Sequence, residues 1–170
     1  MMNVLVTGGA GYIGSHVVEE LQKNGFTPIV YDNLSTGHAA AVPEEVQLVE
    51  GDIHDVVFLK HIMAQFEIDA VIHFAASSLV GESMENPSKY YFNNVEGSLH
   101  LLEAMKGAGV DYIVFSSTAA VYGEPERVPI KEDSCLNPTN VYGRTKLMIE
   151  KMLADYDMAY EMRYVALRLF

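Results

Sequence analysis

The 170-residue sequence is long enough for one domain with a hydrophobic core, and its 49% share of apolar residues is ordinary for a globular protein. Its formal net charge of −12, with only 11 scattered Lys and Arg residues, argues against a nucleic acid or an anionic membrane as partner. Cys135 is the only cysteine, so no intrachain disulfide can form. The first residues lack the basic and apolar regions of a signal peptide, and no apolar run approaches membrane-spanning length. We therefore expect a cytoplasmic protein.

Short apolar runs alternate with amphipathic stretches of helical length. In chain order, the pattern predicts a strand at 3–7, a helix at 12–24, strands at 27–31 and 46–50, a helix at 55–66, a strand at 70–74, a helix at 87–106, a strand at 112–116, a polar loop at 119–138, a helix from 139 or 140 to about 156, and a strand at 164–170. Such alternation is typical of a parallel sheet with right-handed crossovers and helices on both faces. We expect one doubly wound α/β domain over residues 1–170, with strand order 3-2-1-4-5-6 and ligands at the carboxyl ends of the strands.

A glycine-rich loop joins the first predicted strand to the first predicted helix. Gly8, Gly11 and Gly14 have the spacing G-x-x-G-x-x-G. Glycine permits a positive φ in the turn, a close approach of backbone to a pyrophosphate, and tight packing of the helix on the strand. The helix N-terminus then offers N–H donors to the phosphates. The pattern predicts a dinucleotide site, and a tight turn without a ligand is the alternative.

Two acidic residues follow the next predicted strands. A carboxylate at Asp32 can accept both hydroxyls of the adenosine ribose and repels a 2′-phosphate, so the pattern favours NAD over NADP. Asp52 could meet the adenine amine, or it could cap the following helix. The sequence predicts no metal site.

A phenol and an ammonium group stand four residues apart on the helix predicted after the polar loop. This spacing places Tyr142 and Lys146 on one face of the helix. A nearby cation is expected to lower the pKa of the tyrosine, which would make it a general base. Hydroxyl groups at 116–118 would face the same edge of the sheet and could bond the reacting alcohol or ketone. A solvated lysine on an amphipathic helix is the alternative.

The sequence resembles the UDP-glucose/UDP-galactose 4-epimerases of the extended short-chain dehydrogenase/reductase superfamily, which have a Rossmann fold. The resemblance covers essentially the whole chain and is carried by TGGAGYIGSH (7–16), DNLSTG (32–37), GDI (51–53), HFAA (73–76), VGES (80–83), YYFNNVEGSLHLLEAM (90–105), FSSTAAVYGE (115–124) and NPTNVYGRTK (137–146). It implies that Tyr142, Lys146 and Thr118 are catalytic. It also implies contacts to NAD from Gly8, Gly11, Tyr12, Ile13, Gly14, Asp32, Asn33, Leu34, Ser35, Thr36, Gly37, Asp52, Ile53, Phe74, Ala75, Ala76, Asn93, Ser116, Tyr142, Lys146 and Phe170.

The implied reaction removes hydride from C4 of a UDP-hexose, passes through a 4-keto intermediate and returns hydride to the other face. His73 is expected to be a packed strand residue. The family also implies a homodimer through the helices at 90–106 and 139–156, where Leu99, Leu102, Leu147 and Met148 permit contact but could equally face the sheet.

Two departures from the family pattern affect this reading. Some relatives carry a lysine where this chain has Ser78. The family also continues beyond Phe170 with a sugar-nucleotide domain, so our hypothesis is that the 170-residue form binds NAD with weak or no activity. A fragment that ends at this strand would also expose apolar surface that favours association.

Three other functions are possible for such a sequence. A nucleotide-sugar dehydratase needs an acid pair directly after the strand hydroxyl, where this chain has Ala119 and Ala120. A simple ketone reductase would share only the Tyr and Lys. A non-catalytic NAD-binding module is the third alternative.

Overall fold

A computed structural model of the chain describes residues 2–170 and contains a six-stranded parallel sheet. The strand order is β3-β2-β1-β4-β5-β6, as predicted. Its strands are β1 (Asn3–Thr7), β2 (Thr27–Asp32), β3 (Gln47–Glu50), β4 (Ala70–His73), β5 (Tyr112–Thr118) and β6 (Arg163–Leu169). Its helices are α1 (Tyr12–Lys23), the 3-10 turn η1 (Ala39–Ala41), α2 (Val56–Gln65), α3 (Val80–Glu85), α4 (Pro87–Tyr90), the π-helical turn η2 (Tyr91–Glu96), α5 (Gly97–Ala108), the 3-10 turn η3 (Ala119–Tyr122) and α6 (Val141–Tyr160).

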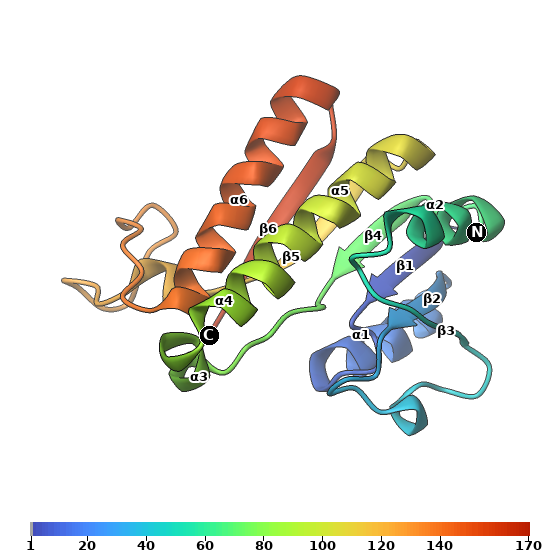
Figure 1. Cartoon of the computed structure of the whole chain (residues 1–170), viewed down its shortest axis with the longest axis horizontal. Helices are drawn as coiled ribbons and strands as arrows, with labels where there is room; N and C mark the ends of the chain where they lie inside the picture. Colours follow the sequence, from blue (N-terminus) through green and yellow to red (C-terminus); the bar gives the residue numbers. More distant parts are fainter. Residues whose placement is uncertain (1) are drawn as a thin grey trace.

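Helices cover the two faces of the sheet unequally (Figure 1). On one face, Leu5 of β1 and Phe115 of β5 pack in a core with residues of α2, α5 and α6. On the other face, Val6 of β1 packs with Val18 of α1. The middle of β1, Val4–Val6, is apolar because both faces of this strand are covered. The doubly wound Rossmann arrangement with helices on both faces is therefore confirmed.

The second face carries an apolar hollow beyond α1. It has a volume of about 290 Å³, and its lining includes Leu21 and Phe26 beside α1 and Val114 and Val165 of β5 and β6. Val165 and Leu167 are 53% and 46% exposed. Within residues 2–170, no helix is long and apolar enough to cross a membrane.

The long helix expected at 87–106 is present as an uninterrupted helical run from Pro87 to Ala108, which a π-helical turn divides into α4, η2 and α5. Asn86 caps α4 through the backbone N–H of Lys89, and the chain then passes through the π-helical turn η2 into α5. Gly109 ends α5 with a φ of +72°. A π-helical turn cannot be read from apolar spacing over so few residues, and α3 was missed because it has only six residues.

The other predicted elements are present with shifted ends. The side chain of Asn140 caps α6 by accepting the N–H of Gly143 at 2.7 Å, and this helix continues four residues beyond the predicted end. The expected polar loop begins with the 3-10 turn η3.

Candidate functional site

The predicted site residues gather along the edge of the sheet where the strands end. β1 pairs with β2 on one side and with β4 on the other. The chain adds β2 and β3 on one side of β1 and then β4, β5 and β6 on the other side, so the strand order reverses between β1 and β4. The end of β1, Thr7, lies level with Tyr31 of β2 and His73 of β4. Ligands of doubly wound sheets bind at such a switch point.

The glycine-rich loop leaves β1 at this switch point. Gly8 has a φ of +73°, and a Cβ built there would lie 2.5 Å from the backbone nitrogen of Ala75. A Cβ on Gly14 would collide with the carbonyl oxygen of Gly8. Only glycine at these two positions lets the loop lie against the chain after β4 and lets α1 pack on the loop.

The loop leads directly into the N-terminus of α1. The N–H of Ser15 donates to the carbonyl of Gly11 at 2.9 Å, so the amides of Tyr12, Ile13 and Gly14 precede the first such bond of the helix. The side chains of Tyr12 and Ile13 are exposed. These N–H groups and the helix dipole form a place where an anion can bind.

Asp32 joins the glycine-rich loop to the loop after β2. Its carboxylate is buried and accepts the N–H of Ala10 at 3.0 Å and the N–H of Leu34 at 2.9 Å. Leu34 adopts a φ of +55°, and a Cβ on Gly37 would lie 3.0 Å from Oδ1 of Asp32. The sequence predicted Asp32 as a ligand for ribose. The structure adds an internal role, because this carboxylate also holds the backbone of both loops. The two backbone bonds leave further lone pairs that can still accept ribose hydroxyls.

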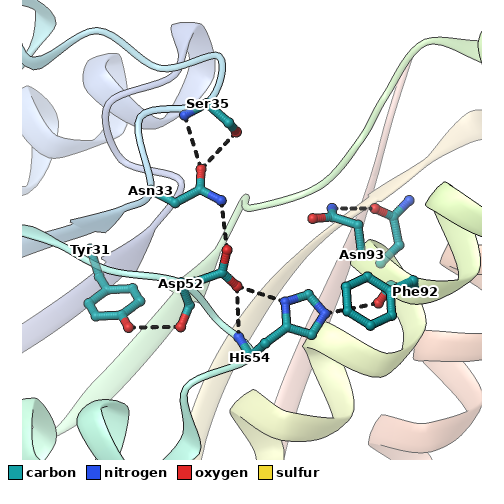
Figure 2. Close-up of polar contacts among 8 residues, drawn as sticks. Tyr31, Asn33, Ser35, Asp52, His54, Phe92 and Asn93 are labelled. Carbon is teal, nitrogen blue, oxygen red and sulfur yellow. Dashed lines mark hydrogen bonds and ion pairs between the residues drawn. The ribbon is translucent and has the colours of Figure 1, made fainter.

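The loop after β2 also contacts the end of β3. The amide of Asn33 donates to Oδ2 of Asp52 at 3.0 Å, while its own oxygen accepts the N–H of Ser35 at 3.1 Å (Figure 2). Burial of Asp52 acts to raise the pKa of its carboxyl group, but hydrogen bonds from Asn33 and His54 outweigh it and lower this pKa. Ile53 is buried beside this carboxylate, and Thr36 is exposed.

The middle of the edge is formed by the chain after β4 and the π-helical turn. The N–H groups of Phe74 and Ala75 both donate to the carbonyl of Thr7. Asn93 donates to the side-chain oxygen of Asn94 at 3.0 Å, and Asn94 holds the backbone of Ser77 through bonds of 2.8 and 3.0 Å. Ala76 is partly buried in the same segment.

The other end of the edge contains the predicted catalytic residues. Lys146 is buried, its Nζ donates to the carbonyl of Ser116 at 2.8 Å, and it lies 5.9 Å from the centre of the Tyr142 ring. Burial lowers the pKa of Lys146 to about 7. Thr118 caps η3 by accepting the N–H of Ala120 at 3.2 Å. Tyr142, Lys146, Ser116 and Thr118 therefore meet at the ends of β5 and α6.

One electrostatic expectation is wrong for this arrangement. Burial raises the pKa of Tyr142, and a hydrogen bond with Thr118 only partly opposes this rise. A lysine whose own pKa is lowered to about 7 carries only part of a positive charge at neutral pH, so it cannot depress the tyrosine pKa as a full cation would.

His73 joins the two ends of the edge as a packed strand residue, the role expected for it. Its Nδ1 lies 2.7 Å from the hydroxyl of Thr7, and its Nε2 lies 3.0 Å from the hydroxyl of Ser98. Burial, with a smaller contribution from the charge of Lys146, lowers the pKa of His73 to about 3. Phe170 is 90% exposed at the last position, and the preceding residue, Leu169, pairs with Thr118 of β5.

Three supporting residues were missed by sequence reasoning. Asn94 is buried and also bonds Thr145 of α6 at 3.1 Å. Ser83 is buried on α3, and its hydroxyl accepts the N–H of Tyr142 at 3.1 Å. His54 bonds Asp52. The paired asparagines at 93 and 94 were the one visible signal, whereas an isolated Ser or His carries none.

A partly buried ion pair lies behind the catalytic end. Both carboxylate oxygens of Glu150 accept from Arg168, at 3.0 and 2.8 Å, and the hydroxyl of Ser117 donates to the same carboxylate at 2.5 Å. This pair connects β5, α6 and β6. It fixes the backbone on which Ser116 and Thr118 stand.

Comparison with known proteins finds epimerases both by family and by sequence identity. A model of the NAD dependent epimerase/dehydratase family matches residues 4–170. A UDP-glucose 4-epimerase of Lactobacillus helveticus is 54% identical over 169 residues, which are 99% of this chain and 51% of the relative. That of Lacticaseibacillus casei is 52% identical over 169 residues, again 99% of this chain and 51% of the relative.

Solved structures agree with these sequences. The structure of UDP-glucose 4-epimerase from Brucella ovis in complex with NAD has a TM-score of 0.98 and 55% identity, and the match covers 100% of this chain and 52% of that one. The UDP-glucose 4-epimerase of Thermotoga maritima with UDP-glucose has a TM-score of 0.93 and 38% identity, with 98% of this chain and 55% of that one covered. The chain spans about half the length of these relatives. It belongs to the NAD dependent epimerase/dehydratase family.

Proposed function

We propose that residues 1–170 form the NAD-binding half of a UDP-glucose 4-epimerase-like isomerase. The observation that carries this proposal is the placement of two groups of residues on one edge of the sheet. The glycine-rich loop leaves β1, and Tyr142 and Lys146 lie beside the end of β5. A dinucleotide that spans this edge would have its phosphates at the first group and its nicotinamide at the second.

The residues present fit NAD at the pyrophosphate and adenosine positions. Glycine at positions 8 and 14 lets the loop pack tightly against Ala75 and lets α1 begin beside the loop, because a Cβ at either position would collide with backbone atoms. The amides of Tyr12 and Ile13 would hold the phosphates, and Asp32 would accept the ribose hydroxyls. The carboxylate of Asp32 also repels a 2′-phosphate, which supports NAD over NADP.

When bound, the oxidised nicotinamide ring would accept hydride from C4 of the sugar and return it to the opposite face of the 4-keto sugar. Tyr142 would take the proton from the C4 hydroxyl and later give it back. Thr118 would donate a hydrogen bond to the oxygen at C4. Lys146, with its pKa lowered to about 7, would hold the ribose hydroxyls beside the ring. Only the protonated fraction of Lys146 would stabilise the phenolate of Tyr142.

The substrate is proposed to be a UDP-hexose, in agreement with the names of the relatives and with UDP-glucose in the Thermotoga maritima structure. Substrate contacts outside residues 1–170 would supply much of the orientation of the sugar. The 170-residue chain by itself is therefore proposed to bind NAD with weak or no epimerisation, because lost binding energy reduces rate as well as affinity.

A homodimer and a cytoplasmic location complete the proposal. Leu99 of α5 and Met148 of α6 are 40% and 42% exposed, which supports contact between two copies through these helices. Leu102, another residue expected there, is buried in the core. The single cysteine supports a reducing compartment.

The test is to denature the purified chain and to identify the released small molecule by absorbance and mass. Epimerisation of UDP-galactose is then assayed on the intact chain, and dimerisation is followed by sedimentation. Bound NAD with little or no turnover is expected. A chain that neither carries nor binds added NAD would contradict the cofactor assignment, and turnover comparable to a complete enzyme would contradict the proposed weakness of the chain.

A further inference from the structure

His54 lies at the adenosine end of the edge, where no role is assigned to it. Its ring Nδ1 is 2.7 Å from Oδ1 of Asp52, and its backbone N–H donates to the same oxygen at 2.9 Å (Figure 2). A carboxylate oxygen can only accept, so Nδ1 is the donor in the ring contact. Oδ1 of Asp52 is thereby held by two donors from one residue.

The opposite side of the His54 ring contacts the π-helical turn η2. Its Nε2 lies 3.2 Å from the carbonyl oxygen of Phe92, to which it can donate only when the ring carries a proton on both nitrogens. In either form the two rings stack, with centres 4.3 Å apart and an angle of 10° between their planes. The edge of His100 packs against His54 with ring centres 5.6 Å apart. These contacts leave the imidazole of His54 little freedom to turn.

The second oxygen of Asp52 remains available. Oδ2 accepts one hydrogen bond from Asn33, and the side chain of Asp52 is 49% exposed. A carboxylate oxygen has two lone pairs, so Oδ2 keeps one for an outside donor. Because His54 and Asn33 hold the carboxylate from both sides, this lone pair has a fixed direction.

We propose that His54 is a positioning residue that aims the Asp52 carboxylate at the exocyclic amine of a bound adenine, through its contacts with Asp52 and the π-helical turn. The inference rests on the proposed NAD-binding function and extends it to the choice of base. The exocyclic amine of adenine is a donor, whereas hypoxanthine has a carbonyl acceptor there. A fixed carboxylate therefore favours adenine, and a freely rotating one discriminates less.

The test measures the affinity of the chain for NAD and for nicotinamide hypoxanthine dinucleotide by calorimetry. For the unchanged chain we expect about tenfold tighter binding of NAD, the effect of one hydrogen bond to a charged group. In His54→Ala we expect the preference to fall to about threefold or less, mainly through weaker NAD binding. A purely structural role for His54 would instead weaken both dinucleotides equally.

Two further variants separate the two contacts of the ring. His54→Asn keeps a donor near the position of Nδ1, so it should retain most of the preference. His54→Gln extends its amide toward Phe92 and should lose the preference. His61→Ala, at an exposed histidine of α2, is the matched control and should behave like the unchanged chain.

The outcomes distinguish this inference from the proposed function. No NAD binding by the unchanged chain would overturn both. NAD binding with the same preference in His54→Ala and the unchanged chain, while circular dichroism shows both folded, would overturn only the role of His54. An unchanged chain that binds the two dinucleotides equally would overturn the aim of Asp52 at the amine.

Discussion

The two ends of the candidate site are built from different parts of the polypeptide. The β1–α1–β2 end presents backbone amides, glycines without side chains, and the buried carboxylate of Asp32. The β5–α6 end presents side chains, and Lys146 there is buried with a pKa lowered to about 7. Binding at the first end therefore depends on the shape of the main chain, whereas the chemistry of the second end depends on how burial changes the pKa values of side chains.

The largest effect should come from Gly14→Val at the backbone end. The added side chain would collide with the carbonyl oxygen of Gly8, so the loop must move away from the helix. We expect affinity for both NAD and ADP to fall by about 100-fold or more, since both use the phosphate position. Fluorescence titration measures this. Gly81→Ala is the control, because a Cβ at Gly81 meets nothing within 4 Å.

The next effect concerns His73, which joins the two ends. Its pKa is lowered to about 3 in the fold, so the unfolded chain binds a proton between pH 6.5 and 3 that the folded chain does not. Its contribution to stability is therefore complete above pH 6.5 and is lost as the pH falls toward 3. From pH 7 to pH 5 we expect about 2 kcal/mol less free energy of unfolding.

His73→Gln isolates this contribution in urea unfolding at the two pH values. Gln does not titrate, so the variant should show a smaller loss between pH 7 and pH 5 than the unchanged chain. An identical loss in both proteins would show that other groups cause the acid sensitivity.

Lys146→Met should separate the two ends by ligand. We expect NAD to bind about tenfold more weakly, because the bonds of the lysine to the nicotinamide ribose are lost. ADP lacks that ribose and should bind within about twofold of the unchanged chain. Equal weakening of NAD and ADP in a calorimetric comparison would contradict the division of the site into two ends.

The smallest effect should come from Ser83→Ala. The buried hydroxyl of Ser83 holds the N–H of Tyr142 at the start of α6. Its loss should lower the free energy of unfolding by about 1 kcal/mol and leave ADP affinity unchanged. Ser88→Ala on the exposed surface of α4 is a suitable control. A change in ADP affinity would show that the effect reaches the backbone end.

Prediction from the sequence was strongest where the signal is local. The glycine spacing at 8, 11 and 14, the acid at 32, and the pair at 142 and 146 each lie within a few residues of a strand or helix end, and the structure has them on one sheet edge. The helix expected at 87–106 is present, but its π-helical turn was not predicted because a single such turn barely alters apolar spacing. The predicted effect of a cation on Tyr142 was wrong because spacing on a helix does not reveal burial.

The alternation of strands and helices could be predicted from hydrophobic periodicity alone. That alternation then indicated the order of the strands. The backbone demands of glycine identified the loop at the carboxyl edge of the sheet. The pKa values of the side chains at that edge, by contrast, depend on the tertiary structure. Lys146 has a pKa of about 7 because β5 and α6 bury it. His54 meets Phe92 across 38 residues of sequence because the loop after β3 packs beside η2. Desolvation and contacts between distant segments arise when the elements pack together, so no local pattern records them.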